Sequence, residues 1–399
     1  MKTVTVVYEG VCGRPLADLD DRTPLEAARC HHAARIAARG RCGVIEPMSE
    51  QRAWPQAALL GALSGIALDV SLGLRRGPVE AVTVEDALPS AVSVFRGDFV
   101  TLDEGVIESS RVAGLGWEET QELASALNQG VDAESVRVAA TGPGTVAVGF
   151  PVAHLHDLDP EPPYDVRGRV ARERWPSGKS GQHVRSLLER AGDVLGQHPV
   201  NEVRLDLHEN PANGLWLWAG GPPVRSGPLV PRATPFGVVT NSQLGRGIAA
   251  LCGATAVGLT IPWSAEEEDP VWSLPELVEL LRRCETLMVY LEAPREAGQY
   301  GSPVEKVRAL DVLDQMVLGP LVQVLDDGFR PYRISLIAEG GACAETGRRF
   351  AAPLPAVVAG DGITPDEAKR WEERACAKGG LGSMTLSSFA NDLWSDSWP

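Results

Sequence analysis

The sequence lacks paired cysteines, long apolar runs and a signal-peptide core, three features that would each identify a class of protein. Its seven cysteines are odd in number, widely separated and free of any C-x-x-C pair, which argues against a disulfide framework and a structural zinc site. No apolar run approaches the roughly 18 residues that a membrane-spanning helix needs. The apolar start is interrupted by Glu9 before it reaches the length of a signal-peptide core. We therefore expect reduced thiols, no membrane segment and a cytoplasmic location.

Basic residues are also in deficit, because 53 acidic residues face 37 lysines and arginines and the net charge is −16. Nucleic acids and anionic lipid surfaces are polyanions and would be repelled at long range. The sequence thus predicts neither a nucleic-acid partner nor a membrane partner. At 399 residues, 44% of them hydrophobic, the chain is long enough to bury a large core and to form two domains.

Histidine is missing from the second half of the chain, because all seven histidines precede residue 209. In an α/β protein the carboxyl ends of the parallel strands build the active site, so later strands can supply no imidazole to a metal there. The segment HLHDLD offers His154 and His156 either as metal ligands or as ordinary polar loop residues. The segment PSGKSG, residues 176–181, lacks the first glycine of a phosphate-binding P-loop and is expected to be an exposed loop.

Apolar, β-branched runs that alternate with helical patterns predict an α/β core. KTVTVVYEG is typical of a buried parallel strand, and a helix over residues 24–39 follows it, with Thr23 as its N-cap and Gly40 as its stop. The same rhythm resumes from about residue 236. The strand candidates there are FGVVTNS, TAVGLT, TLMVYLEA, YRISLIAEG and LPAVVAG.

The segment between these two parts has a different pattern. SVFRGDFVTLDEGVIE predicts a hairpin, WEETQELASALNQG a helix, and VRVAATGPGTVAVGF two strands about a Gly-Pro-Gly turn. We therefore predict a discontinuous core domain over residues 1–89 and 206–399, interrupted by an inserted α+β domain over residues 90–205.

Six stretches, in the same order along the chain, resemble those of one known family. They are VVYEGVCGRPLADLDDRTPLEAA, ARGRCGVIEP, GDFVTLDEGVIESSRVAGL, HPVNEVRLDLHENPANGLWLWAGGPP, EAGQYGSPVEKVRALDVLDQMVLGPL and GGLGSM. Together they resemble the archaeal-type, cofactor-independent phosphoglycerate mutases of the alkaline phosphatase superfamily. The resemblance implies an alkaline-phosphatase-like α/β fold, with a mixed, largely parallel sheet between helices and an inserted α+β domain that closes over the substrate. It also implies a two-metal centre that moves a phosphoryl group on glycerate through a phosphoserine intermediate.

Several positions that react or bind metal in this family carry other residues here. The family's first-strand aspartate falls on Glu9, and its second acid falls on Gly13. Its nucleophilic serine falls near Arg52, where no hydroxyl stands. Its histidine and aspartate after Glu-Ala-Gly fall on Gln299 and Tyr300. The resemblance therefore implies a site without its nucleophile and without several of its metal ligands.

The remaining positions follow the same trend. The family's acid before Glu-Ala-Gly falls on Arg295, the acid of its Asp-His pair on Glu339, and its last histidine on Arg349. Glu9 and Glu339 are then the remaining ligands and, without imidazoles, would hold at most a weakly bound magnesium ion. Arg52, Arg295 and Arg349 either pair with these two glutamates or receive an anion.

These substitutions predict a phosphoglycerate-mutase-like pseudoenzyme that needs no cofactor and binds an anionic small molecule or a protein partner. The candidate ligand-binding residues are Glu9, Arg14, Arg52, Arg295, Gln299, Tyr300, Glu339 and Arg349. The alternative is a metal-independent enzyme that acts on a phosphorylated or carboxylated small molecule in a specialised pathway, with Cys12 or Cys343 as a possible nucleophile. A third interpretation also stays open, in which a shifted alignment hides an intact metal site that uses His31, His32 or the HLHDLD segment.

Overall fold

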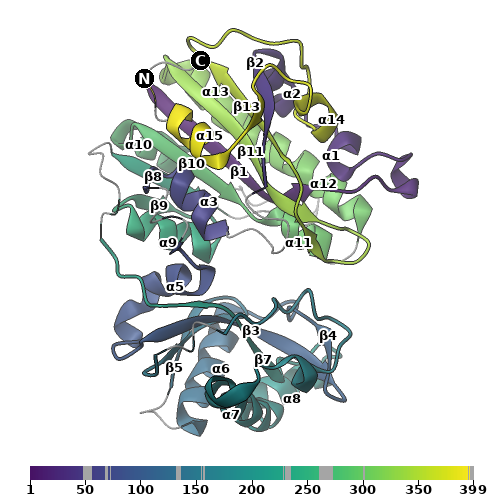
Figure 1. Ribbon diagram of the computed structural model, residues 1–399, viewed down its shortest axis with the longest axis vertical. Coiled ribbons are helices and arrows are strands. Elements are labelled where there is room, and N and C mark those ends of the chain that lie inside the picture. The colour runs from purple at the N-terminus through teal and green to yellow at the C-terminus, as the bar shows by residue number, and fades with distance from the viewer. Residues whose placement is uncertain are drawn as a thin grey trace. The chain divides into compact units, whose positions relative to one another are not determined.

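The computed structural model describes residues 1–47, 56–67, 71, 73–131, 136–153, 155, 158–227, 229, 235–259, 273–299, 302–393 and 395. The chain divides into two compact units (Figure 1). Met1–Gly73 and Gly227–Pro399 form the core unit, and Leu74–Ser226 form the inserted unit. None of the helices in these ranges is long and apolar enough to cross a membrane.

The core unit is built on a mixed, largely parallel sheet with the strand order β14, β2, β13, β11, β1, β10, β8, β9, and with β12 beside β11. The run from β9 to β11 is parallel throughout, whereas β13 is antiparallel to both β11 and β2. The bounds are β1 Lys2–Cys12, β2 Gly40–Ile45, β8 Phe236–Thr240, β9 Thr255–Val257, β10 Thr286–Leu291, β11 Tyr332–Ala342, β12 Arg349–Phe350, β13 Leu354–Gly360 and β14 Gly382–Met384. All strand candidates from the second half of the sequence are therefore present, and the predicted α/β class is confirmed.

Helices of the core unit pack in two groups. One group joins α3 to α9 and α15, and the other joins α1 and α2 to α12 and the π-helical segment η5. The bounds are α1 Pro24–Ala27, α2 His31–Ala38, α3 Gln56–Leu63, α9 Gln243–Leu251, α10 Leu274–Arg283, α11 Ala293–Gln299, α12 Pro303–Leu313, η5 Asp314–Leu318, α13 Gly319–Gly328, α14 Glu373–Cys376 and α15 Leu386–Leu393, with a 3-10 turn η1 at Ala17–Leu19. Many of these helices begin at a serine, threonine or proline that supplies the expected capping chemistry.

The single helix predicted over residues 24–39 is wrong, because α1 and α2 are separate helices. Cys30 lies between them in the left-handed conformation, with a φ of 38°. The carboxylate of Asp311 accepts hydrogen bonds from the two amides before α2, at 2.8 and 3.1 Å, and Asp314 accepts from two amides in the first turn of α2, at 2.9 and 2.8 Å. These carboxylates satisfy amides that would otherwise be without partners at a helix start, so they stabilise the break.

The inserted unit is an antiparallel sheet with helices and a hydrophobic core of its own. Its strand order is β4, β3, β6, β5, with β7 also paired to β3. The bounds are α5 Arg76–Ala81, η2 Val82–Ala87, β3 Ser93–Asp103, β4 Val106–Ser109, α6 Trp117–Gly130, β5 Arg137–Gly142, β6 Thr145–Phe150, η4 Ala171–Arg174, α7 Gly178–Gly196, α8 Pro199–Asp206 and β7 Gly214–Gly221. The predicted hairpin, the helix α6 and the strand pair about Gly-Pro-Gly are confirmed. Residues 178–181, expected to be a loop, instead form the first turn of α7, whose apolar face is buried in this unit's core.

The inserted unit is longer than the predicted range of 90–205. It begins at Leu74 because α5 packs on β3 and β7. It extends to Ser226 because β7 pairs with the middle of β3, where Trp216 lies opposite Asp98. The sequence pattern predicts that residues 74–89 and 206–226 belong to the core, because it contains no signal of the β3–β7 pairing.

Candidate functional site

Two buried glutamates lie side by side near the carboxyl ends of β1 and β11. The two strands are parallel and in register, so Glu9 is the partner of Glu339 across the ladder. Both residues are fully buried, with 0% of their surface exposed. Two buried carboxylates at adjacent positions repel each other and need nearby positive charge or hydrogen-bond donors.

Arg349 supplies positive charge to both glutamates. The short strand β12 returns antiparallel to β11 and places this residue opposite Ala342. Its Nη1 lies 3.0 Å from Oε1 of Glu9, and its Nη2 lies 3.0 Å from each carboxylate oxygen of Glu339. The Arg349 side chain is 2% exposed, so this is a buried ion-pair bridge. Arg349 thus makes ion pairs with both glutamates, which is one of the two roles predicted for the arginines.

Arg295, on α11, approaches the same carboxylate from another element. Its Nε lies 3.0 Å from Oε1 of Glu9, and its Nη2 lies 3.2 Å from Glu292 and 3.7 Å from Glu296. Its Nη1 donates a hydrogen bond of 2.9 Å to the side-chain oxygen of Gln299. The stretch that follows β10 therefore carries an arginine held among carboxylates.

Several polar side chains complete this site, and the sequence analysis did not identify them. The amide of Gln56 donates to Glu9 over 2.7 Å, the hydroxyl of Tyr290 donates to the other oxygen of Glu9, and Ser242 donates to Glu292 over 2.6 Å. A signal for Gln56 was available, because it is the only polar residue of the apolar helix α3, QAALLGAL. Tyr290 reaches Glu9 because β10 is the neighbour of β1 in the sheet, which the sequence does not state.

We call Glu9, Glu292, Arg295, Glu296, Glu339 and Arg349 the arginine–glutamate cluster. It contains four carboxylates and two guanidinium groups, and each guanidinium group contacts at least two of the carboxylates. Within the part of the chain that the structure describes, no group of three or more histidine, cysteine, aspartate and glutamate side chains is arranged to hold a metal ion.

The other candidate residues from the sequence have different surroundings. Arg14 is exposed, and its guanidinium lies 5.0 Å from the ring centroid of Phe350, the neighbour of Arg349. His31 and His32 lie on α2, where His32 is close to the start of β11 rather than to its carboxyl end. Arg52, Tyr300, His154 and His156 lie outside the described residues.

The two candidate thiols differ in their protonation. Burial, together with the nearby charge of Glu373, raises the pKa of Cys12 well above its usual value, which disfavours a thiolate. Cys343 lies in the turn after β11. Burial acts to raise its pKa as well, but hydrogen bonds from the Thr346 hydroxyl and the amides of Glu345 and Thr346 outweigh it and lower the pKa. Cys343 is therefore the better nucleophile candidate of the two.

Lys306 is a buried cation beside this site that the sequence analysis did not single out. It is 0% exposed, and its ammonium group donates to the carbonyls of Cys12 and Ala342 over 2.9 and 2.7 Å. Cys12 and Ala342 are the last residues of β1 and β11, so Lys306 links the ends of the two strands by hydrogen bonds. Burial lowers the pKa of Lys306 to about 8.

We predict that Arg349→Met lowers the free energy of unfolding by about 3–5 kcal/mol, because it leaves Glu9 and Glu339 buried beside each other with less positive charge. The matched control is Arg283→Met, which removes an exposed arginine 2.7 Å from Glu279 and should change the free energy of unfolding by less than about 1 kcal/mol. Urea unfolding of the full chain measures both variants. Equal effects of the two substitutions would show that the bridge contributes nothing particular to stability.

A second prediction concerns Lys306 and pH. Its pKa is about 8 in the folded chain and near 10.4 when unfolded, so between these values the unfolded state binds more protons and folding stability rises with pH. The free energy of unfolding of the parent, minus that of Lys306→Met, should therefore increase by about 2 kcal/mol from pH 8 to pH 10. Subtracting the variant removes the titration of other groups. Parallel curves for the two proteins would contradict a lowered pKa at this lysine.

The family profile described as 2,3-bisphosphoglycerate-independent phosphoglycerate mutase matches residues 37–201. The chain is 26% identical over 400 residues to the 2,3-bisphosphoglycerate-independent phosphoglycerate mutase of Methanothrix thermoacetophila, which covers 98% of each chain. It is 27% identical over 397 residues to 2,3-bisphosphoglycerate-independent phosphoglycerate mutase 2 of Methanothermobacter thermautotrophicus, covering 96% of this chain and 94% of the relative.

Solved structures share the fold over the whole length. A protein from Pyrococcus horikoshii superposes with a TM-score of 0.72 at 20% identity, covering 100% of this chain and 99% of that one. The cofactor-independent phosphoglycerate mutase from Thermoplasma acidophilum superposes with a TM-score of 0.51 at 21% identity, covering 98% of each chain. The predicted fold class is thereby confirmed. Over nearly its whole length the chain is therefore similar in sequence to archaeal 2,3-bisphosphoglycerate-independent phosphoglycerate mutases, and it shares the fold of the solved Thermoplasma acidophilum enzyme.

Proposed function

We propose that this chain is a phosphoglycerate-mutase-like pseudoenzyme, in which an internal ion-pair cluster stands where relatives carry out two-metal phosphoryl transfer. Its role is then to bind an anionic metabolite or a partner protein. The observation that carries the proposal is the guanidinium of Arg349, which lies 3.0 Å from carboxylate oxygens of both Glu9 and Glu339.

The donor set supports this proposal because it does not fit a pair of divalent cations. Metal ions in such sites need oxygen or nitrogen ligands that face an open position between them. The two strand-end carboxylates instead face guanidinium groups, which carry fixed positive charge at the distance of a direct hydrogen bond. A dication between Glu9 and Glu339 would be repelled by Arg349, and Arg295 would add to that repulsion at Glu9.

The arginines also differ from metal ions in what they offer to a substrate. A metal ion polarises an oxygen and activates a nucleophile by exchanging one of its ligands. The guanidinium of Arg349 directs its N–H groups to two buried carboxylates and has little of its surface exposed. The cluster therefore keeps the geometry of the strand ends but supplies no equivalent activation of a phosphoryl group.

The contacts that the two arginines already make bear on the choice of ligand. An anion brought to the arginine–glutamate cluster would have to displace glutamates that Arg295 and Arg349 already contact. These contacts disfavour an anion in this position. A binding role for the chain is better served by another surface of the molecule.

The test is the metal content of the purified protein by elemental analysis, together with phosphoglycerate mutase activity in added manganese or magnesium. We expect substoichiometric metal and no activity, because the strand-end carboxylates are already paired. The Methanothrix thermoacetophila relative, prepared in the same way, is the positive control. Two equivalents of metal with mutase activity in this chain would overturn the proposal.

A second candidate function is a metal-independent enzyme that acts on a phosphorylated or carboxylated small molecule. The observation that favours it is Cys343, whose thiol pKa is lowered by local hydrogen bonds at the end of β11. Nucleophilic catalysis by cysteine requires a thiolate near neutral pH.

We predict that iodoacetamide alkylates Cys343 at pH values at which Cys12 does not react, because the pKa of Cys343 is lowered and that of Cys12 is raised. Peptide mass spectrometry of the folded protein across a pH series gives the two rates, and Cys343→Ser confirms the assignment. If Cys12 reacts first, or if neither thiol reacts before the protein unfolds, the catalytic candidate loses its support.

A further inference from the structure

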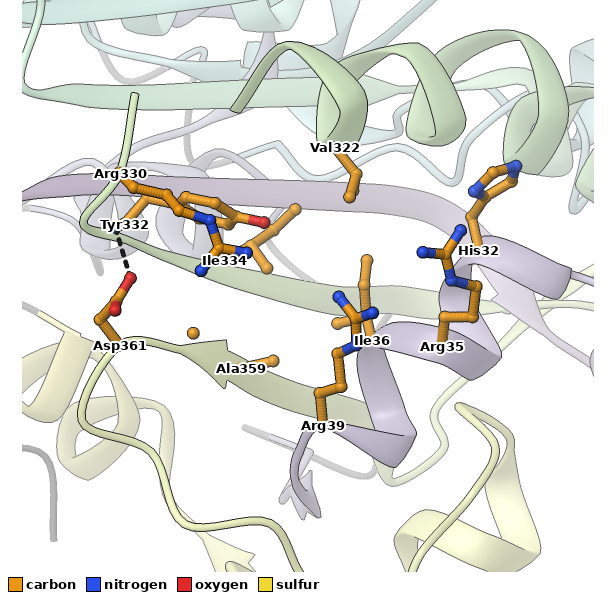
Figure 2. Close-up of a pocket in the computed structure, with 11 residues that line it drawn as sticks. His32, Arg35, Ile36, Arg39, Val322, Arg330, Tyr332, Ile334, Ala359 and Asp361 are labelled. Atoms are coloured by element: carbon orange, nitrogen blue, oxygen red, sulfur yellow. Dashed lines mark hydrogen bonds between the residues drawn. The ribbon is translucent and has the colours of Figure 1, made fainter. Parts of the chain in front are cut away.

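A second site candidate lies at the other end of the sheet from the arginine–glutamate cluster. A pocket of about 200 Å³ is enclosed by α2, α13, the start of β11 and the end of β13 (Figure 2). From Tyr332, which starts β11, to Glu339 the strand advances about 23 Å at its usual rise per residue. The pocket is therefore separate from the cluster, although one strand contributes to both.

The walls combine an apolar floor with a basic rim. Ile36, Ile334 and Ala359 are buried and form the floor. Arg35 lies in the last turn of α2, and Arg39 is the C-cap residue that follows the helix, so the two arginines are about one turn apart in the chain. Figure 2 shows these two side chains extending from α2 and its C-cap into the pocket.

A third guanidinium, that of Arg330, comes from the segment before β11. It lies 5.7 Å from the ring centroid of Tyr332 and forms an ion pair of 2.6 Å with Asp326, so its charge is largely neutralised. The other acid at the pocket, Asp361, accepts a hydrogen bond of 3.0 Å from the backbone amide of Tyr332. Burial raises the pKa of Tyr332 to about 12, so its hydroxyl adds no negative charge.

Arg35 and Arg39 form no ion pair with an acidic side chain in the part of the chain that the structure describes. A cation at the end of a helix is favourable by itself, but that effect does not explain the hollow beside α2. In a chain of net charge −16, two neighbouring guanidinium groups without acidic partners create a local positive potential. Such a potential attracts an anion and favours its binding.

The chemistry of the walls selects a class of ligand. Two adjacent guanidinium groups match the charge and the oxygen geometry of a phosphate dianion. The apolar floor and the Tyr332 ring match a small apolar or planar group attached to it. We propose that this pocket binds a small phosphate monoester with an apolar or planar body, and that Arg35 and Arg39 hold the phosphate. The inference rests on the binding role proposed above and adds to it a location and a class of ligand. Its test is independent of the test for mutase activity.

The test uses phenyl phosphate and inorganic phosphate as probes, with calorimetric titration of the full chain. Phenyl phosphate should bind more tightly than inorganic phosphate, because its ring covers the apolar floor, and phenol should not bind. Arg35→Gln and Arg39→Gln should each weaken binding of phenyl phosphate by roughly tenfold to a hundredfold, and the double variant should abolish it. The control Arg282→Gln removes one equally positive, exposed side chain on α10 and should bind as the parent does.

Protection from phenylglyoxal, an arginine reagent, gives an independent location for the probe. Bound phenyl phosphate should slow modification of Arg35 and Arg39 and leave that of Arg282 unchanged, as measured by peptide mass spectrometry. Absence of binding at millimolar phenyl phosphate, binding that survives in the double variant, or equal loss in Arg282→Gln each overturns the inference. If the chain shows mutase activity and also binds phenyl phosphate, the proposed function is refuted and the pocket proposal is supported. If it shows neither activity nor binding, the pocket proposal is refuted and the proposed loss of mutase activity is supported.

Discussion

The core of this protein depends on one constraint, which is that Glu9 on β1 and Glu339 on β11 lie opposite each other and are both buried. The parallel register places two fully buried carboxylates on neighbouring strands, whose axes are about 4.8 Å apart. Such a pair is stable only if positive charge reaches both carboxylates. The return of β12 along β11 brings Arg349 to them, and the position of α11 brings Arg295 to Glu9. The local topology around the strand ends is thus tied to the neutralisation of two charges.

The backbone next to Glu9 is adapted to this arrangement. Gly10 has a φ of 69°, and a Cβ at this position would lie 2.7 Å from the Cα of Arg295. A side chain would therefore be strained and would also push α11 away from the end of β1. Glycine lets the helix that carries Arg295 approach close enough for its guanidinium to reach the Glu9 carboxylate. Lys306 holds the same two strands together one step further along, through the carbonyls of Cys12 and Ala342.

The sequence predicts much of this architecture, but only where the signal is local. Alternation of apolar runs and helical patterns identifies β8, β10, β11 and β13, and the glycine-containing turns identify the hairpins of the inserted unit. The break between α1 and α2 could not be read from its own residues, because Asp311 and Asp314, which stabilise it, are about 280 residues away. The limits of the inserted unit were missed for the same reason, since β7 joins it by pairing with a strand more than 100 residues earlier.

The residues of the candidate site also fall into two groups, those that the sequence identifies and those that only the fold reveals. Glu9, Arg295, Glu339 and Arg349 were found because the resemblance to a family aligned them with metal-binding positions. Gln56, Tyr290 and Lys306 have no such marker, and their roles follow from the order of strands in the sheet and from burial. For Gln56 the sequence does contain a signal of a buried polar role, because this residue is a polar position in the otherwise apolar helix α3. For Lys306 the pattern PVEKVRAL is that of an ordinary surface helix, and only the fold shows that its ammonium group is buried.

The charge distribution along β11 connects these features to function. The carboxyl end of the strand lies in a cluster whose guanidinium groups contact buried carboxylates. Its amino end lies at a pocket where Arg35 and Arg39 have no acidic partner among the described residues. Most phosphate sites in α/β proteins use the carboxyl ends of the strands, but here the arginines at that end are already engaged. If the chain binds an anionic metabolite, electrostatics favours the amino end of β11 as its site.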